Sequence, residues 1–207
     1  MRRERRESQP TRDDAPPQVA GAPSADRAPS ANAAPDVAER GPGAPARPAN
    51  RPPLAASAQR VQDAIAALGL DLQVFELEAP VRTAADAARA VGCEVGQIAK
   101  SLIFRTRSDR AVLVITSGAN RVNEARIAAM LGEPIGRAEP DFVRERTGFA
   151  IGGIPPVGHR TPLVTFVDRD LGRWPRIWAA AGHPNALFEL EPGQLVRLVG
   201  APMVEVT

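Results

Sequence analysis

The amino-acid composition changes abruptly after residue 53, and this change limits which part of the chain can fold. Residues 1–53 hold 11 of the 21 prolines, and their only large apolar residues are Met1, Val19 and Val37. Such a segment cannot bury enough apolar surface to offset the entropy lost on ordering. We therefore predict a disordered Pro/Ala/Arg-rich tail over 1–53 and one folded domain over 54–207, which is long enough for an independent core.

Charge is balanced within the predicted domain. The tail carries nine arginines against seven acids, whereas residues 54–207 carry 17 basic and 17 acidic residues. The sequence pI of about 9.4 therefore does not describe a strongly basic domain, and a nucleic-acid partner would need a local patch. No apolar run approaches a membrane span and no secretory leader is recognisable, so we expect a cytoplasmic protein without membrane contact.

Helix-like and strand-like patterns alternate through residues 54–207. Ser57 can cap a first helix, Thr83-Ala-Ala-Asp86 is a variant of the capping box, and residues 97–105 and 111–116 have the spacing of a hairpin. Helices mixed with paired strands indicate an α/β fold, a mixed sheet with packed helices. The expected helices are 57–68, 83–91, 123–131, 140–146, 171–180 and 191–199, and the expected strands are 72–77, 97–105, 111–116, 163–168, 186–190 and 202–206.

Lys100 is the only lysine among the 26 Lys and Arg residues. An ammonium is a compact point charge whose pKa can fall on burial, whereas a guanidinium is planar and always charged. Lys100 lies in an apolar run, and on a strand it shares one face with Ile98, Leu102 and Phe104. An inward lysine is costly unless it has a partner or lines a cleft. The alternative is a lysine on the solvent face or at a sheet end, and composition alone leaves both interpretations open.

Residues 147–159 form a second unusual segment, with four glycines and two prolines in thirteen positions. Gly152 and Gly153 allow a ligand to approach the main chain closely, and Pro155 and Pro156 stiffen the residues that follow. Such a loop can direct backbone N–H groups at an oxyanion or a ribose oxygen. The alternative is an ordinary connection between elements.

The sequence gives little support for a metal, a cofactor or a covalent nucleophile. His159 and His183 are the only histidines, and neither has a second histidine or cysteine at metal-ligand spacing. Cys93, the only cysteine, excludes an internal disulfide and has no recognisable base beside it, so we interpret it as a packing or surface residue. We expect a protein that uses no metal and no cofactor.

Four blocks of sequence, in order, resemble the YbaK/prolyl-tRNA editing family. Residues 97–104 (QIAKSLIF) resemble the strand that bears the family's essential lysine, and residues 115–123 (ITSGANRVN) resemble its strand-to-helix turn. Residues 147–156 (TGFAIGGIPP) resemble its glycine-rich loop, with Gly152 to Pro156 fitting a Gly-x-x-x-Pro element, and residues 181–186 (AGHPNA) resemble its late turn. Ser101 departs from relatives that carry threonine or asparagine after the lysine.

This resemblance implies a mixed, largely antiparallel sheet and a deacylase acting on mischarged tRNA, most often tRNA for proline carrying a small wrong amino acid. Lys100 would be the catalytic residue, and the chain would act in trans on the acceptor end, with prolyl-tRNA synthetase as a candidate partner. The adjacent ribose hydroxyl of the tRNA would activate the attacking water. The matched blocks supply the implied substrate-binding residues: Ser117, Gly118, Gly152, Gly153, Ile154, Pro155, Pro156, Gly182 and His183.

Two other functions remain compatible with the sequence. The chain could be a non-catalytic tRNA- or synthetase-binding module that kept the fold, or a hydrolase of another small aminoacyl ester. A deacylation assay with several mischarged tRNAs and with free aminoacyl-adenosine separates the three hypotheses.

Overall fold

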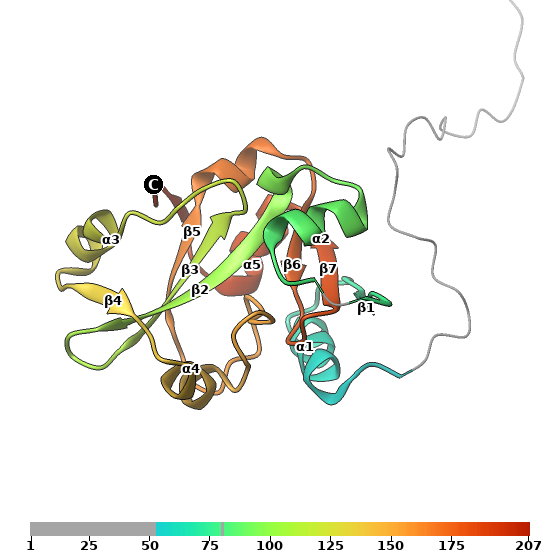
Figure 1. Ribbon diagram of the computed structural model, residues 1–207, viewed down its shortest axis with the longest axis horizontal. Coiled ribbons are helices and arrows are strands. Elements are labelled where there is room, and N and C mark those ends of the chain that lie inside the picture. Colours follow the sequence, from blue (N-terminus) through green and yellow to red (C-terminus); the bar gives the residue numbers. More distant parts are fainter. Residues whose placement is uncertain (1–52, 80) are drawn as a thin grey trace, which may run out of the picture. The chain divides into compact units, whose positions relative to one another are not determined.

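The computed structural model describes residues 53–79 and 81–207 (Figure 1). The predicted tail therefore lies, apart from Pro53, outside the described residues, and the boundary between residues 53 and 54 stays a prediction. Within the described ranges, no helix is both long and apolar enough to cross a membrane. The described part is a mixed α/β fold, which confirms the predicted class.

The sheet runs in the order β1-β7-β6-β2-β3-β5-β8, and β4 pairs with β2 outside this path. Antiparallel ladders join β1 to β7, β7 to β6, β2 to β3 and β2 to β4, whereas β6–β2, β3–β5 and β5–β8 are parallel. The helices are α1 Ala56–Ala67, α2 Ala84–Val91, α3 Glu124–Leu131, α4 Pro140–Thr147 and α5 Pro192–Val199. The strands are β1 Val74–Glu76, β2 Ile98–Thr106, β3 Ala111–Ser117, β4 Ile135–Arg137, β5 Val164–Asp168, β6 Ile177–Ala180, β7 Ala186–Leu190 and β8 Met203–Val204.

Several local predictions are confirmed by the backbone. β2 and β3 form the expected hairpin, with Ala99 opposite Ser117 and Arg105 opposite Ala111. The capping box of α2 is present: the Asp86 N–H donates to Thr83 Oγ1 (3.0 Å), and the Thr83 N–H donates to the Asp86 carboxylate (3.2 Å). Two orphan donors at the helix start are thus satisfied by the chain's own side chains.

The predicted helix over 171–180 is wrong. Arg169–Arg173 is a 3-10 turn instead, and Ile177–Ala180 is strand β6. Pro175 explains the break, because the residue before a proline is driven into the extended region and Trp174 has φ −106° and ψ 141°. Strand pairing of β6 with both β2 and β7 then decides the extended state.

Two further differences concern element ends. Ser57 does not cap α1, because the helix begins at Ala56 and its N-cap position is Ala55, which makes no side-chain cap. The entry to α1 is held instead by the Ala55 N–H, which donates to Glu76 Oε1 of β1 (2.8 Å). β4 is absent from the predicted elements, since three residues following a helix carry too little alternation to be recognised.

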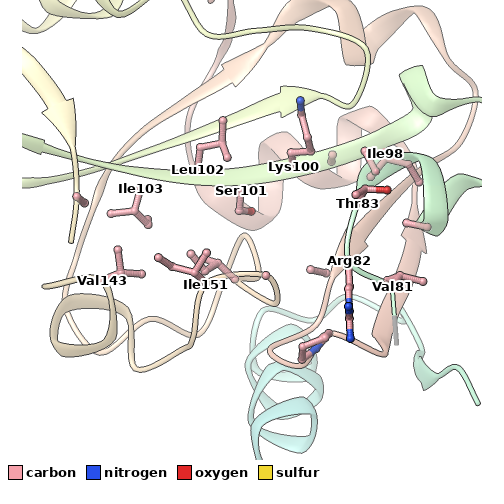
Figure 2. Close-up of a pocket in the computed structure, with 18 of the residues that line it drawn as sticks. Val81, Arg82, Thr83, Ile98, Lys100, Ser101, Leu102, Ile103, Val143 and Ile151 are labelled. Carbon is pink, nitrogen blue, oxygen red and sulfur yellow. The ribbon is translucent and has the colours of Figure 1, made fainter. Parts of the chain in front are cut away.

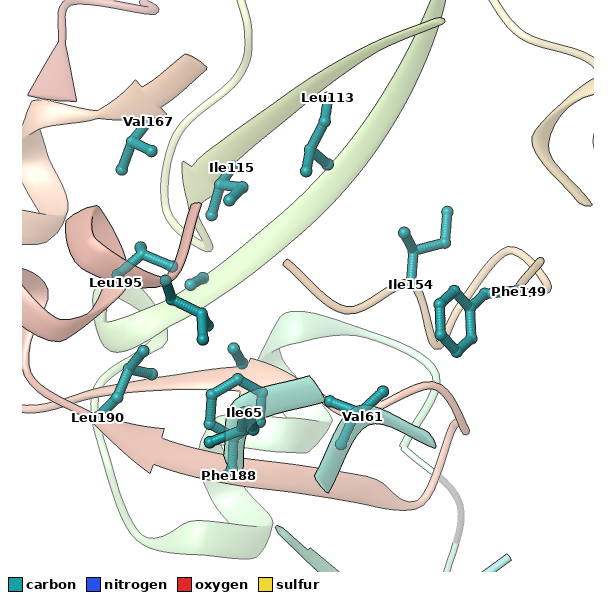
Figure 3. Close-up of a cluster of buried hydrophobic side chains, with 14 of the residues drawn as sticks. Val61, Ile65, Leu113, Ile115, Phe149, Ile154, Val167, Phe188, Leu190 and Leu195 are labelled. Atoms are coloured by element: carbon teal, nitrogen blue, oxygen red, sulfur yellow. The ribbon is translucent and has the colours of Figure 1, made fainter. Parts of the chain in front are cut away.

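The core is divided between the two faces of the sheet. On one face, α1, α4 and α5 bury the largest apolar cluster, which includes Val61, Phe188 and Leu195 (Figure 3). On the other face, α2 covers a cluster around Ile98, and a separate cluster around Phe104 includes Ile127 of α3. The middle of β2, between these two clusters, carries no helix on that face, and the candidate site lies around this part of the strand.

Candidate active site

Strand β2 has a partner along the whole of one edge but only at the two ends of the other. β3 pairs with residues 99–105, whereas β6 reaches only Ile98 and Ala99, and β4 only residues 104–106. Residues 100–103 therefore have no strand partner on the second edge, over a length of about 13 Å. This open edge is the central feature of the site.

The register identifies which backbone groups face the opening. The Gly118 N–H donates to the Ile98 carbonyl (2.7 Å), and the Thr106 N–H donates to the Arg110 carbonyl (2.9 Å). Because hydrogen bonding alternates along an antiparallel pair, even-numbered residues of β2 bond to β3 and odd-numbered residues turn away from it. The N–H and C=O of Ser101 and the N–H of Ile103 therefore point into the gap, without a partner among the described residues.

A cavity of about 580 Å³ surrounds this edge (Figure 2). Its lining includes Arg82 and Thr83, which precede α2, and Glu124 at the start of α3. Apolar side chains of α4 and the glycine-rich loop also line it, among them Val143 and Ile151. The cavity thus reaches both faces of the sheet around β2.

Lys100 and Ser101 point to opposite sides of β2, as consecutive strand residues must (Figure 2). The Lys100 amine is directed away from Ile151 and donates from Nζ to the Asn120 carbonyl (2.9 Å). Burial, together with the positive charge of Arg121, lowers the pKa of Lys100, and the Asp168 carboxylate partly opposes this shift. Lys100 is therefore half-buried and tethered by a carbonyl oxygen, without a carboxylate in direct contact.

A buried carboxylate fixes the turn that holds Lys100. Asp168, at the end of β5, is 1% exposed. Its Oδ2 accepts from Thr116 Oγ1 (2.9 Å), the Ser117 N–H (3.0 Å) and Asn120 Nδ2 (2.8 Å). These bonds satisfy the buried charge without a cationic partner and fix the turn whose Asn120 carbonyl binds the lysine.

Sequence reasoning missed Asn120 and Asp168. Asn120 lies inside the quoted block 115–123 but was not assigned a role, and Asp168 is 48 residues away from it. A signal was present, since Asp168 ends an apolar strand and a buried acid must find several donors.

Ser101 differs from its neighbours because its Oγ atom is buried and has no hydrogen-bond partner. In Figure 2 its side chain lies on the side of β2 that faces Ile151. A buried hydroxyl without a partner is uncommon in folded proteins and calls for an explanation. Ser101 Oγ and the unpaired backbone groups of the open edge are thus polar atoms without hydrogen-bond partners close to one another.

The glycine-rich loop packs closely against the late turn. Gly152 has φ 97°, a conformation that favours glycine. A Cβ on Gly153 would lie 2.8 Å from the His183 carbonyl carbon, and one on Gly182 would lie 2.7 Å from Phe149 Cε1. These glycines are therefore required for the two segments to touch, which holds Gly152 and Ile154 at the cavity.

The predicted site residues fall into two groups. Lys100, Gly152 and Ile154 line the cavity. Among the others, the Ser117 hydroxyl donates to the Gly96 carbonyl (2.8 Å) and the Pro155 carbonyl contacts His159 Nε2 (2.9 Å). The residues that do not line it are Ser117, Gly118, Gly153, Pro155, Pro156, Gly182 and His183. Their assignment to substrate binding stays a prediction, and their observed contacts hold the surrounding turns together.

The remaining ionisable candidates lie outside the cavity. Cys93 is half-buried, and desolvation raises the pKa of its thiol to about 11, so the thiol keeps its proton near neutral pH. Burial lowers the pKa of His159, whose ring lies against the Pro155 carbonyl. Across residues 53–79 and 81–207, no three His, Cys, Asp or Glu side chains form a group that could hold a metal ion. The expectation of a reaction without metal or cofactor remains a prediction.

Most of the folded part of the chain is similar to known proteins. Residues 78–198 match the model of the aminoacyl-tRNA editing domain family. A crystal structure of a candidate trans-editing enzyme for prolyl tRNA synthetase superposes with a TM-score of 0.72 at 48% sequence identity, covering 75% of this chain and 99% of that one. The uncharacterized protein YwhH of Bacillus subtilis is 31% identical over 122 residues, which are 59% of this chain and 78% of YwhH.

A shorter match connects the chain to synthetases. Proline--tRNA ligase of Thermosipho melanesiensis is 38% identical over 79 residues, which are 38% of this chain but only 14% of the ligase. The similarity is thus to a small part of a much longer protein.

Proposed function

Because this chain belongs to the aminoacyl-tRNA editing domain family, we propose that it is a trans-acting hydrolase that cleaves the ester of mischarged tRNA. The proposed substrate is tRNA for proline carrying a small wrong amino acid, and the proposed location is the cytoplasm. The single observation that carries the proposal is the cavity around β2, which is lined by Lys100 and also by Gly152 and Ile154 of the glycine-rich loop.

The chemistry of translation explains why such a hydrolase is needed. A synthetase pocket separates side chains that differ by one methylene by only about 1–3 kcal/mol. A second, hydrolytic site then removes the errors that binding alone lets through. The need is greatest for small apolar side chains, because they offer a pocket few groups to reject.

We propose that the aminoacyl group and the terminal phosphate of the substrate lie on different sides of β2 when the ester is in the cavity. The aminoacyl group lies on the side of Ser101 and Ile154, where apolar side chains predominate. The terminal phosphate lies on the other side of β2, where Lys100 lines the cavity (Figure 2). An ammonium is a usual protein ligand of phosphate.

Water then attacks the ester carbonyl, and the backbone amides around Gly152–Ile154 stabilise the developing oxyanion. The ribose hydroxyl next to the ester is the proposed activator of the water, since the described residues lining the cavity include no histidine and only one carboxylate, that of Glu124. Lys100 contributes by fixing the substrate, and its lowered pKa is compatible with exchanging the Asn120 carbonyl for an anion.

A deacylation assay with a panel of mischarged tRNAs tests this function. We expect turnover of at least one mischarged tRNA for proline, and a loss of about 100-fold or more in kcat/KM for Lys100→Ala. Lys100→Arg tests the point charge, because the larger guanidinium should not restore full activity. Arg89→Ala removes an exposed cation of α2 outside the cavity and serves as the matched control.

Three outcomes would decide against parts of the proposal. Near-normal turnover by Lys100→Ala would remove Lys100 from the reaction. Binding of tRNA without turnover of any member of the panel would identify a non-catalytic module. Equal hydrolysis of free aminoacyl-adenosine and aminoacyl-tRNA would identify a hydrolase of small esters.

The proposed partners are the acceptor end of mischarged tRNA and prolyl-tRNA synthetase. The equal numbers of acidic and basic residues in 54–207 argue against strong binding along the whole tRNA. Recognition of an RNA end by shape, stacking and the ribose hydroxyl needs little total charge.

A further inference from the structure

The open edge of β2 carries an inference about how the substrate is recognised. We propose that Ser101 and Ile103 form a main-chain subsite that binds the α-amino ester unit common to all aminoacyl groups. The substrate amine donates to the Ser101 carbonyl, and the substrate ester carbonyl accepts from the Ile103 N–H. This subsite rests on the proposed function and specifies which atoms of the aminoacyl group the protein binds.

The available groups have the pattern of a strand-pairing position. In a parallel ladder, one residue of the added strand donates to the carbonyl of residue n−1 and accepts from the N–H of residue n+1. With Leu102 as residue n, these groups are the Ser101 carbonyl and the Ile103 N–H, both directed into the gap. An aminoacyl ester has one amine and one carbonyl on adjacent carbons, so a single aminoacyl group can occupy such a position.

The neighbouring parallel strand leaves this position empty. β6 pairs with β2 through Trp178 and Ala179 and ends at Ala180, which lines the cavity. From Ala181 the chain turns back, and the Ala181 N–H donates to the Ala186 carbonyl (2.8 Å). The aminoacyl group would therefore extend the sheet where β6 stops, as peptide ligands do when they add to an exposed sheet edge.

The unpaired hydroxyl of Ser101 supports the same assignment. Its Oγ atom is buried without a partner, on the side of β2 that faces the glycine-rich loop. An amine has more than one N–H, so it can donate to the Ser101 carbonyl and to Oγ together. A buried polar group that is satisfied only when ligand is present favours the bound state and discriminates against ligands without the donor.

This arrangement predicts a requirement that does not depend on the amino-acid side chain. An acyl group without an α-amine leaves the Ser101 carbonyl and hydroxyl unpaired in an apolar cavity. Binding should therefore distinguish an alanyl group from a propionyl group, although their carbon skeletons are the same.

Non-hydrolysable amides provide the test, because they separate recognition from ester reactivity. We would measure the Kd of 3′-alanylamino-3′-deoxyadenosine and of 3′-propionylamino-3′-deoxyadenosine with the full chain by calorimetry. We expect the alanyl compound to bind at least 10-fold more tightly. By NMR, the alanyl compound should slow hydrogen exchange of the Ile103 amide, and the exposed Asp109 amide in the β2–β3 turn serves as an internal reference.

Variants of the serine then assign the contact. Ser101→Ala should weaken binding of the alanyl compound about 3-fold to 10-fold and leave the propionyl compound unchanged, while Ser108→Ala in the β2–β3 turn should change neither. Equal affinities for the two compounds, no measurable binding of either, or unchanged exchange of the Ile103 amide would overturn the subsite. If mischarged tRNA is still deacylated in that case, the proposed function stands and only the subsite fails. An absence of deacylation would reject the function itself.

Discussion

Lys100 and Ser101 are consecutive residues of β2, yet the polar groups on their two sides of the strand are satisfied to different degrees. On the side of Lys100, Asp168 and Asn120 form a closed network in which each buried polar group has a partner. On the side of Ser101, a buried hydroxyl has no partner, and at the adjacent open edge of β2 three backbone groups have none among the described residues. The two regions are only one residue apart.

This difference indicates that the groups around Lys100 are preorganised, whereas the groups around Ser101 are available to bind a ligand. A fully paired network is rigid and holds a charge in place before the substrate arrives. Unpaired polar groups are a cost to the folded chain, and a ligand that pairs them recovers that cost as affinity. Four tests would break or sharpen this contrast, and we give them from the largest expected effect on stability to the smallest.

Removing the centre of the paired network should have the largest effect on stability. Asp168→Ala leaves the Thr116 hydroxyl, the Ser117 N–H and the Asn120 amide without their acceptor, so we expect the free energy of unfolding to fall by about 3 kcal/mol or more. Urea denaturation measures this, with the exposed Asp71→Ala as the control. Asp168→Asn should retain the fold better but still lower kcat, because the turn that positions Lys100 is loosened. If Asp168→Ala were as stable as the parent protein, the hydrogen bonds to Asp168 would not contribute to the free energy of unfolding.

The packing of the glycine-rich loop against the late turn is tested by adding one methyl group at Gly153. Gly153→Ala places a Cβ 2.8 Å from the His183 carbonyl carbon, and backbone cannot yield as a side-chain end can. We expect a loss of about 2 kcal/mol and a rise in KM, since the loop must move. Gly193→Ala meets nothing within 4 Å in α5 and should be neutral or stabilising by about 0.5–1 kcal/mol. Similar melting temperatures for the two variants would contradict the close packing.

Two hydroxyls in neighbouring strands compare the paired and unpaired sides directly. Thr116 Oγ1 donates to Asp168, so Thr116→Val should cost about 1–2 kcal/mol of unfolding free energy. Ser101 Oγ has no partner, so Ser101→Ala should leave stability unchanged or raise it slightly. Thermal and urea unfolding of both variants measure the difference. A larger loss for Ser101→Ala than for Thr116→Val would reverse the assignment of the two sides.

Lys100→Met should change stability by no more than about 1 kcal/mol at neutral pH, although we expect activity to be lost. Burial lowers the pKa of Lys100 below its ordinary value of 10.5. As pH rises toward 10.5, the folded protein releases this proton before the unfolded chain does, so folding becomes more favourable. The parent protein should therefore gain stability relative to Lys100→Met just below pH 10.5. Urea denaturation at pH 7.5 and pH 10 checks the sign, and the opposite trend would mean that the ammonium is stabilised by the fold.

Prediction from sequence succeeded where the signal was local. The hairpin of β2 and β3 follows from two alternating apolar runs around a polar turn, and the α2 capping box follows from Thr83 and Asp86. It failed for residues 171–180, where the predicted helix is a 3-10 turn followed by β6. A strand of four residues is decided by its two neighbours in the sheet, which local pattern does not contain.

The candidate site shows the same division. Resemblance to the family and the solitary lysine directed attention to Lys100, Gly152 and Ile154, which all line the cavity. Asn120 and Asp168 were missed because their contact joins segments 48 residues apart. Ser101 was noticed only as a departure from relatives, and nothing in the sequence indicates that its hydroxyl lacks a partner.

The sequence by itself determined that Lys100 and Ser101 lie on opposite faces, because side chains alternate along any strand. Only the tertiary structure decided that β6 stops at Ala180 and that β4 begins pairing at Phe104. The opening between them is a property of three chain segments at once, so its backbone donors and acceptors become available only after the sheet has assembled.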